Sequence, residues 1–101
     1  MTQILALNYG SKDEIVRAVK KVVSNKEEVT EESIQKHLDL NKDVDLLIRT
    51  SGEVRISNFL LWQCAYAEMF FTNTLWPDFN EQELEEIINN FKKRERRFGG
   101  I

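Results

Sequence analysis

The sequence predicts an α/β fold, a parallel sheet with flanking helices, and three observations carry this prediction. Apolar segments of strand length alternate with segments of helical periodicity. Residues 43–49 are rich in Val, Leu and Ile, which is typical of a parallel strand covered on both faces. The predicted order, β-α-α-β-α-β-α, is the alternation that right-handed crossovers produce. Residues 1–101 contain no linker and no internal repeat, so we expect a single domain.

The first half of the chain predicts one strand and two helices. Residues 3–8 (QILALN) are expected to form a buried strand. Ser11 and Glu14 have the spacing of a capping box, and the apolar positions after them share one face of a helix that should end at Asn25. A second, short helix is expected over residues 31–38.

The second half predicts an apolar helix, a strand and a final helix after the strand at 43–49. The apolar helix is expected over residues 58–66 and the strand over residues 68–72. Asn80 should cap the last helix, with Glu83 reaching back to complete a capping box. Three strands make a thin sheet with an open apolar edge, which natural proteins seldom tolerate. We therefore expect a preceding segment or a partner to cover that edge.

Composition excludes several classes of protein. The net charge of −3 argues against a general nucleic-acid binder, because such domains carry a strong positive excess. The single cysteine, Cys64, excludes an internal disulfide framework and is expected to be a small core residue. No apolar run approaches the roughly 20 residues that a membrane-spanning helix needs. No secretory pattern opens the chain, so we expect a cytoplasmic protein.

Polar residues that suit an anion site follow the strand at 43–49. Arg49 ends that strand, and ligands of open parallel sheets bind beyond the carboxyl ends of the strands. Arg55 and Ser57 follow within one loop, and the helix expected to start at Ser57 or Asn58 would add free N–H groups. Guanidinium forks and backbone N–H groups match phosphate oxygens. The pattern therefore predicts a phosphate or diphosphate site.

One carboxylate follows in apolar surroundings. Glu68 is the only acid between Glu53 and Asp78. Burying a carboxylate is costly unless it meets a cation. Mg²⁺ is a suitable cation, since it takes one or two carboxylates together with phosphate oxygens.

Simpler structural interpretations stand beside these functional ones. Arg49 and Glu53 are able to form a solvated ion pair, and Glu68 is equally consistent with an acid at a strand edge. His37 lies on a short amphipathic helix and is expected to be solvated. The basic run at residues 92–97 is expected to complement the end of a helix rather than to bind nucleic acid.

Much of the chain resembles the cis-prenyltransferases, the undecaprenyl diphosphate synthase family, in the stretches ALNYG, IRTSGEVRISNFLLWQCAYAE, FTNTLWPDF and RERRFGG. Enzymes of this family extend an allylic diphosphate, such as farnesyl diphosphate, with isopentenyl diphosphate. The resemblance implies that Arg49, Arg55 and Ser57 bind the isopentenyl diphosphate and that Glu68 takes part in binding Mg²⁺. It implies accessory roles for Asn8, Glu53, Arg97 and Gly99.

The chain departs from the family at one large feature. The family's amino-terminal His-Gly-Asn-x-Arg-Trp loop holds the allylic diphosphate and supplies an acid that works with Mg²⁺. Nothing in this chain matches it, and the single histidine is His37. The resemblance therefore implies a carboxyl-terminal portion that carries no catalytic residue of its own and is inactive alone.

The resemblance also implies a homodimer formed through this carboxyl-terminal half. A physical reason lies in seven large apolar side chains, too many for a thin sheet to cover: Phe59, Leu60, Leu61, Trp62, Tyr66, Phe70 and Phe71. The segment Arg97-Phe98-Gly99 matches a family motif that reaches the partner's isopentenyl diphosphate. The alternative is a non-catalytic subunit or dimerisation module of a heteromeric prenyltransferase.

Overall fold

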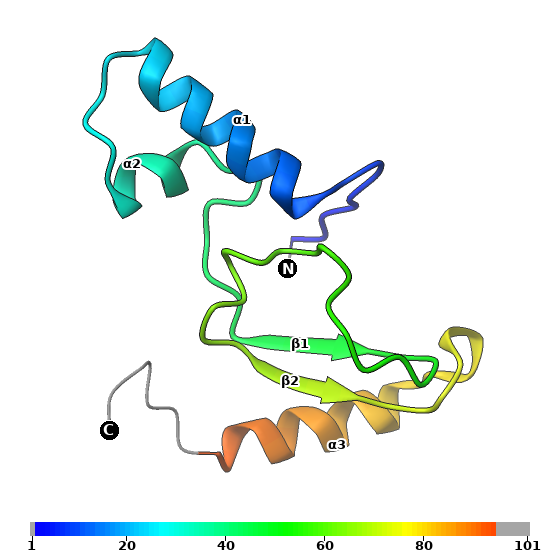
Figure 1. The fold of residues 1–101 in the computed structure, drawn as a ribbon. Coiled ribbons are helices and arrows are strands. Elements are labelled where there is room, and N and C mark those ends of the chain that lie inside the picture. Colours follow the sequence, from blue (N-terminus) through cyan, green and yellow to red (C-terminus); the bar gives the residue numbers. More distant parts are fainter. Residues whose placement is uncertain (1, 95–101) are drawn as a thin grey trace. The chain divides into compact units, whose positions relative to one another are not determined.

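The computed structural model describes residues 2–94, which divide into two compact units (Figure 1). The first unit holds residues 2–42 together with residues 56–63. The second holds residues 43–55 together with residues 64–94. The elements follow the order α1, α2, β1, β2, η1 and α3. The single-domain organisation expected from the sequence stays a prediction.

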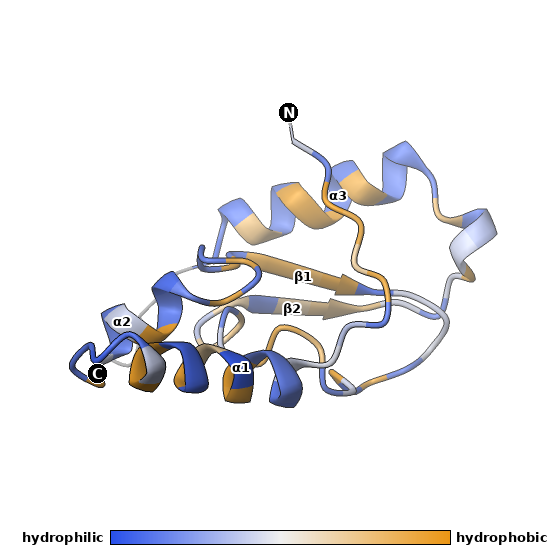
Figure 2. Ribbon diagram, turned by 90° about the horizontal axis from the view of Figure 1, so that it is seen from above, coloured by the Kyte–Doolittle hydropathy of each residue, from blue (hydrophilic) through white to orange (hydrophobic). Residues whose placement is uncertain are grey.

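The first unit is built on two helices, α1 (Ser11–Ser24) and α2 (Glu31–Lys36), which pack side by side. The buried face of α1 carries Ala18 and Val22, and hydrophobic positions recur along the ribbon of this helix in Figure 2. Leu38, which follows α2, is also buried. Both predicted helices are therefore confirmed, and the second ends two residues earlier than expected.

The capping box predicted at the start of α1 is wrong. Gly10 is the N-cap and offers no side chain, and Ser11 already lies inside the helix. Asn58 caps the helix from a distant part of the sequence. Its carbonyl oxygen accepts a hydrogen bond from the Ser11 N–H at 2.8 Å, and its Oδ1 accepts one from the Lys12 N–H at 2.9 Å. Two of the unpaired N–H groups of the first turn are satisfied in this way.

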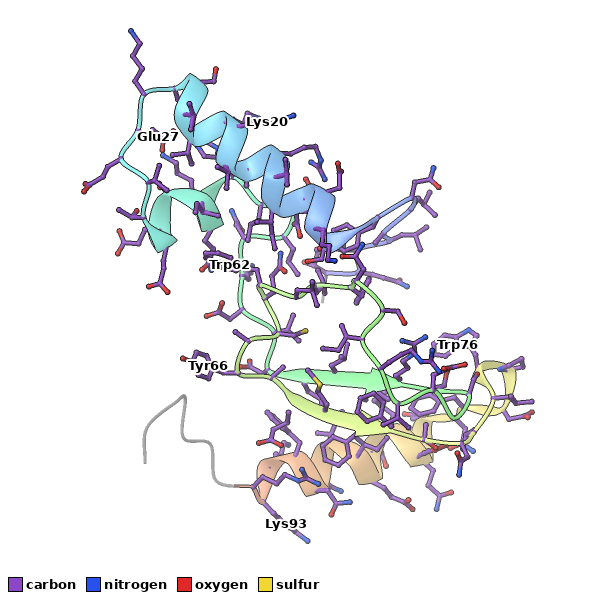
Figure 3. All side chains as sticks on the ribbon, in the orientation of Figure 1. Lys20, Glu27, Trp62, Tyr66, Trp76 and Lys93 are labelled. Atoms are coloured by element: carbon purple, nitrogen blue, oxygen red, sulfur yellow. The ribbon has the colours of Figure 1, made fainter. Side chains whose placement is uncertain are left out.

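Charged contacts join the loop between the two helices to the end of α2. The Glu27 carboxylate contacts Lys36 Nζ at 2.9 Å and His37 Nε2 at 2.8 Å; Figure 3 labels Glu27 between α1 and α2. The hydrogen bond from Lys36, and next the one from His37, lowers the pKa of Glu27 to about 2. The expectation that His37 is solvated is wrong, because its side chain is only 14% exposed and is paired.

Residues 3–8 form no strand, contrary to the sequence prediction. Ile4, Leu5 and Leu7 are between 70% and 80% exposed, and this apolar stretch follows the N label in Figure 2. A strand exists only where a neighbouring strand takes its N–H and C=O groups. The sheet of the described residues contains β1 and β2 alone, so residues 3–8 have no such neighbour in it.

The apolar helix predicted over residues 58–66 is also absent. The segment is a run of bends and turns, because Ser57, Asn58 and Leu60 adopt left-handed φ angles of 53°, 60° and 46°. A right-handed helix has no place for these angles. The helix start that was expected to offer free N–H groups at Ser57 or Asn58 therefore does not exist here.

The second unit is built on two parallel strands, β1 (Leu46–Arg49) and β2 (Glu68–Phe71). Leu46 pairs with Glu68 and Arg49 pairs with Phe71. This parallel pairing, together with the helices, confirms the α/β fold class. The strand expected at residues 3–8 is missing from it. Both strands start and end within three residues of their predicted limits.

The strands are followed by a short 3₁₀ helix, η1 (Trp76–Asp78), and by α3 (Glu81–Lys92), which runs alongside them in Figure 1. Asn80 caps α3, as predicted, by accepting a hydrogen bond from the Glu83 N–H at 2.9 Å. The Glu83 side chain, expected to return to the cap, instead accepts hydrogen bonds from Thr72 and Thr74. Ile87 is the buried residue of the helix.

The contact between Asn58 and α1 leads to a stability prediction. Asn58→Ala should lower the free energy of unfolding by about 2 kcal/mol, because it removes the hydrogen bond from the Lys12 N–H and replaces asparagine, which tolerates the left-handed region, with alanine, which does not. Asn58→Gly should cost about half as much, since glycine tolerates that conformation. Urea unfolding followed by circular dichroism measures both, with Asn41→Ala in an exposed loop as the control. Equal stability of Asn58→Ala and wild type would contradict the assignment.

Candidate anion-binding site

The carboxyl end of β1 brings the two predicted arginines together. Arg49 is the last residue of β1, and its guanidinium Nη1 donates a hydrogen bond to the carbonyl oxygen of Arg55. The chain between them turns through Ser51 and Gly52, whose φ angles are 68° and 74°. A Cβ at Gly52 would lie 3.2 Å from the Asn73 side chain. Glycine therefore suits this turn for its backbone angle and for the space around it.

Arg55 carries an exposed guanidinium that is able to receive an anion. Its Nε lies 3.0 Å from a Glu53 carboxylate oxygen, and the two side chains are 71% and 45% exposed. An ion pair this exposed contributes little to stability. A multivalent anion would compete with Glu53 for the guanidinium fork at small cost. With Arg49 alongside, the loop carries two positive charges against one negative charge.

Glu68 lies at the other end of the strands from this loop. It is the first residue of β2 and pairs with Leu46, whereas Arg49 pairs with Phe71. The two positions are three residue steps apart, a distance of about 10 Å along the ladder. The structure therefore does not bring Glu68 to the arginine pair.

Glu68 instead contacts Arg94, which lies just beyond the end of α3. Its Oε2 lies 3.2 Å from Nη1 of Arg94, whose guanidinium sits 4.4 Å from the centre of the Phe70 ring. Within residues 2–94 no group of three His, Cys, Asp or Glu side chains is placed to hold a metal ion. One carboxylate fits Mg²⁺ as a single protein ligand, because the ion takes its other ligands from phosphate and water. Glu68 is therefore suited to bind Mg²⁺ only together with oxygen ligands from phosphate and water.

The other predicted site residues, Asn8, Ser57, Arg97 and Gly99, do not belong to the unit that holds the arginine pair or lie outside the described residues. Asn8 and Ser57 belong to the first unit, whereas Arg49 and Arg55 belong to the second. Asn8 and Ser57 both adopt left-handed φ angles, of 50° and 53°. Arg97 and Gly99 lie outside the described residues, so their predicted roles stay predictions.

A buried carboxylate that sequence reasoning missed holds the segment carrying Ser57. Glu14 is fully buried and accepts hydrogen bonds from the Tyr9 hydroxyl, from Gln63 Nε2 at 3.2 Å and from the Leu40 N–H at 3.3 Å. Burial, and next the bond to Glu14, raises the pKa of Tyr9 to about 12. The signal was available, because Glu14 lies one helical turn before the buried Ala18 and so on the buried stripe.

The only cysteine behaves as predicted. Cys64 is buried, and this burial raises the pKa of its thiol. A thiol in such surroundings is a poor nucleophile, since the thiolate is the reactive form. Cys64 is therefore a core residue and takes no part in the candidate site.

The sequence of this chain matches a known protein family. The sequence profile described as putative undecaprenyl diphosphate synthase matches residues 1–99. The chain belongs to this family. Two relatives named isoprenyl transferase come from Wolinella succinogenes and Fusobacterium nucleatum. They are 58% and 53% identical to this chain, and each match covers 100% of the chain and 45% of the relative. The chain therefore spans less than half the length of these curated relatives.

Solved structures agree with this assignment. A probable undecaprenyl diphosphate synthase from Campylobacter jejuni matches with a TM-score of 0.90 and 50% identity, over 93% of this chain and 45% of that one. A lavandulyl diphosphate synthase from Lavandula x intermedia, in complex with dimethylallyl diphosphate, matches with a TM-score of 0.82 and 36% identity. That match covers 93% of this chain and 44% of the lavender enzyme. The resemblance stated from sequence is confirmed.

Among residues 2–94, no helix combines the length and the apolar composition that crossing a bilayer requires.

Proposed function

We propose that this chain supplies the isopentenyl diphosphate-binding part of a cis-prenyltransferase, which condenses isopentenyl diphosphate onto an allylic diphosphate. The observation that carries the proposal is the loop that brings Arg49 and Arg55 together at the carboxyl end of β1, in a chain of this family. The diphosphate bound to the lavender enzyme supports the ligand class. Within the family, the product proposed for this protein is undecaprenyl diphosphate, which serves the synthesis of the lipid carrier of the bacterial cell wall. The protein is proposed to act in the cytoplasm.

Each proposed residue has a physical role. Arg49 and Arg55 bind and orient the diphosphate through charge-assisted hydrogen bonds, and the Ser57 hydroxyl adds a neutral donor. Glu68 contributes one carboxylate to Mg²⁺. Bound there, Mg²⁺ would supply neutralisation of the negative charge on the diphosphates. Four accessory residues are proposed near the bound substrate: Asn8, Glu53, Arg97 and Gly99.

The exposed arginine gives a direct binding test. Arg55→Ala should weaken the binding of inorganic diphosphate by about 1.5–3 kcal/mol, the usual contribution of hydrogen bonds to charged groups. Isothermal titration calorimetry of the full chain measures it. Arg17→Ala is the matched control, since Arg17 is another exposed arginine but pairs with Asp13 and Asp39 in the first unit. Superimposable titrations of wild type and Arg55→Ala would contradict the proposal.

The isolated chain should be catalytically silent. It lacks a match for the family loop that holds the allylic diphosphate, and positioning of reactants supplies much of such a rate. Incubation with farnesyl diphosphate, isopentenyl diphosphate and Mg²⁺ tests this, with product extracted and separated by chain length. A Mg²⁺-dependent polyprenyl product above the no-protein control would show the prediction to be wrong.

Addition of the missing part separates the two candidate functions. The remaining residues of the Campylobacter jejuni relative would supply the half that this chain does not cover, and the exposed Ile4, Leu5 and Leu7 offer an apolar surface for it. Restored synthesis in the mixture supports the enzymatic role. Binding without synthesis supports the alternative, a non-catalytic subunit or dimerisation module.

Self-association through the carboxyl-terminal half is also proposed. The second unit exposes Tyr66, Phe71, Leu75 and Trp76, and Figure 3 labels Tyr66 and Trp76. Exposed aromatic side chains of this size are enriched at protein interfaces. Trp62, expected among the interface residues, is partly buried, and its indole N–H donates to Gln35 at 3.3 Å.

Sedimentation equilibrium at micromolar concentration tests the association. The wild-type chain should have the mass of a dimer. Tyr66→Ser combined with Trp76→Ser should shift it toward the monomer, because the exchange removes apolar area from the proposed contact. Val16→Ser on the exposed face of α1 is the control. A monomer mass for the wild type throughout the concentration range would rule the dimer out.

A further inference from the structure

Glu83 joins α3 to the chain that leaves β2. Its Oε1 accepts hydrogen bonds from the hydroxyls of Thr72 at 2.8 Å and Thr74 at 2.9 Å. The Thr72 hydroxyl oxygen also accepts a bond from the Thr74 N–H at 3.2 Å. The Glu83 backbone is itself fixed, because its N–H donates to the Asn80 cap. One carboxylate oxygen therefore holds residues 72–74 in a single turn.

Residues 72–74 are hydrogen-bonded to the loop of the candidate site, residues 50–55. The Ser51 N–H donates to the carbonyl oxygen of Thr74 at 2.8 Å, and the Gly52 N–H donates to that of Thr72 at 2.9 Å. The Thr72 N–H donates to the carbonyl oxygen of Arg49 at 2.9 Å. Three backbone hydrogen bonds thus connect the turn to Arg49 and to the two residues Ser51 and Gly52 that follow it in the loop.

The loop needs such a restraint. Ser51 is not a glycine and has a φ of 68°. The left-handed region costs about 1–2 kcal/mol for a residue with a Cβ. A conformation of this kind persists where surrounding contacts over-determine it. Loss of the hydrogen bonds to the 72–74 turn would release Ser51 and let the loop, with Glu53 and Arg55, leave its position.

We propose that Glu83 is a positioning residue, which acts through Thr72 and Thr74 to hold residues 50–55 in the conformation that binds diphosphate. The inference rests on the proposed function for its ligand. Glu83 acts as a hydrogen-bond acceptor, and its negative charge is not what the loop requires. The same restraint keeps the carbonyl oxygen of Arg55 within reach of the Arg49 guanidinium, so that the two positive charges stay together.

Two substitutions at Glu83 separate the acceptor from the charge. Glu83→Gln keeps an oxygen at Oε1, so both hydroxyls retain an acceptor, whereas Glu83→Leu removes it at similar volume. Glu85→Leu, on an exposed position of the same helix, is the control. Thr74→Val, which removes one of the two hydroxyls, is a second and milder variant should Glu83→Leu fail to fold.

Two readouts are measured on the full chain. Hydrogen exchange of the Ser51 and Gly52 amides reports the restraint without any ligand, and calorimetric titration with inorganic diphosphate reports the site. Glu83→Leu should speed exchange of both amides and weaken diphosphate binding about tenfold, the loss expected for roughly one hydrogen bond. Thr74→Val should show a smaller change in the same direction. Glu83→Gln and Glu85→Leu should match the wild type in both.

The outcomes distinguish this inference from the function on which it rests. Unchanged exchange and binding in Glu83→Leu would overturn the positioning role, and so would an equal loss in Glu83→Gln, which would assign the effect to charge. A wild-type chain that does not bind diphosphate would overturn the proposed function. Faster exchange of Ser51 and Gly52 in Glu83→Leu would then still support the restraint itself.

Discussion

The parallel pairing of β1 with β2 is the interaction on which the candidate site depends. Because the strands run in the same direction, the chain leaves Arg49 and Phe71 at the same edge of the ladder. The two segments that follow lie close enough for the Ser51 and Gly52 amides to reach the carbonyl oxygens of Thr74 and Thr72. A loop that contains left-handed backbone and two arginines is stable there only because its amides are satisfied by that neighbour.

The first unit depends on an equivalent constraint, a buried carboxylate. Glu14 receives hydrogen bonds from Tyr9, Gln63 and Leu40, and a buried polar group is tolerated where it is hydrogen-bonded in this way. They tie α1 to residues 56–63, and Asn58 of that segment caps α1 in return. The turns around Ser57 are therefore fixed by polar contacts with a helix far away in sequence.

Among residues 2–94, the groups proposed to bind diphosphate and Mg²⁺ do not all lie in one place. Arg49 and Arg55 lie at one end of the ladder, whereas Glu68 lies at the other and contacts Arg94. A magnesium ion would need oxygen ligands beyond Glu68, and diphosphate and water are able to provide them. The chain itself spans about 45% of the length of its relatives.

The sequence by itself determined the family, the α/β class, both strands of the sheet, the helices α1, α2 and α3, and the place of Arg49 at a strand end. Helical periodicity, strand composition and the Asn80 cap depend on residues close together in the chain, so a single sequence is enough to predict them. Only the tertiary structure decided that residues 3–8 form no strand, because they lack a neighbouring strand. It also decided that residues 58–66 form turns, which cap and bind α1, instead of a helix. It likewise decided that Glu83 faces Thr72 and Thr74 rather than its own helix cap. Each outcome depends on whether another segment of the chain offers a partner, and spacing within one segment carries no information about that.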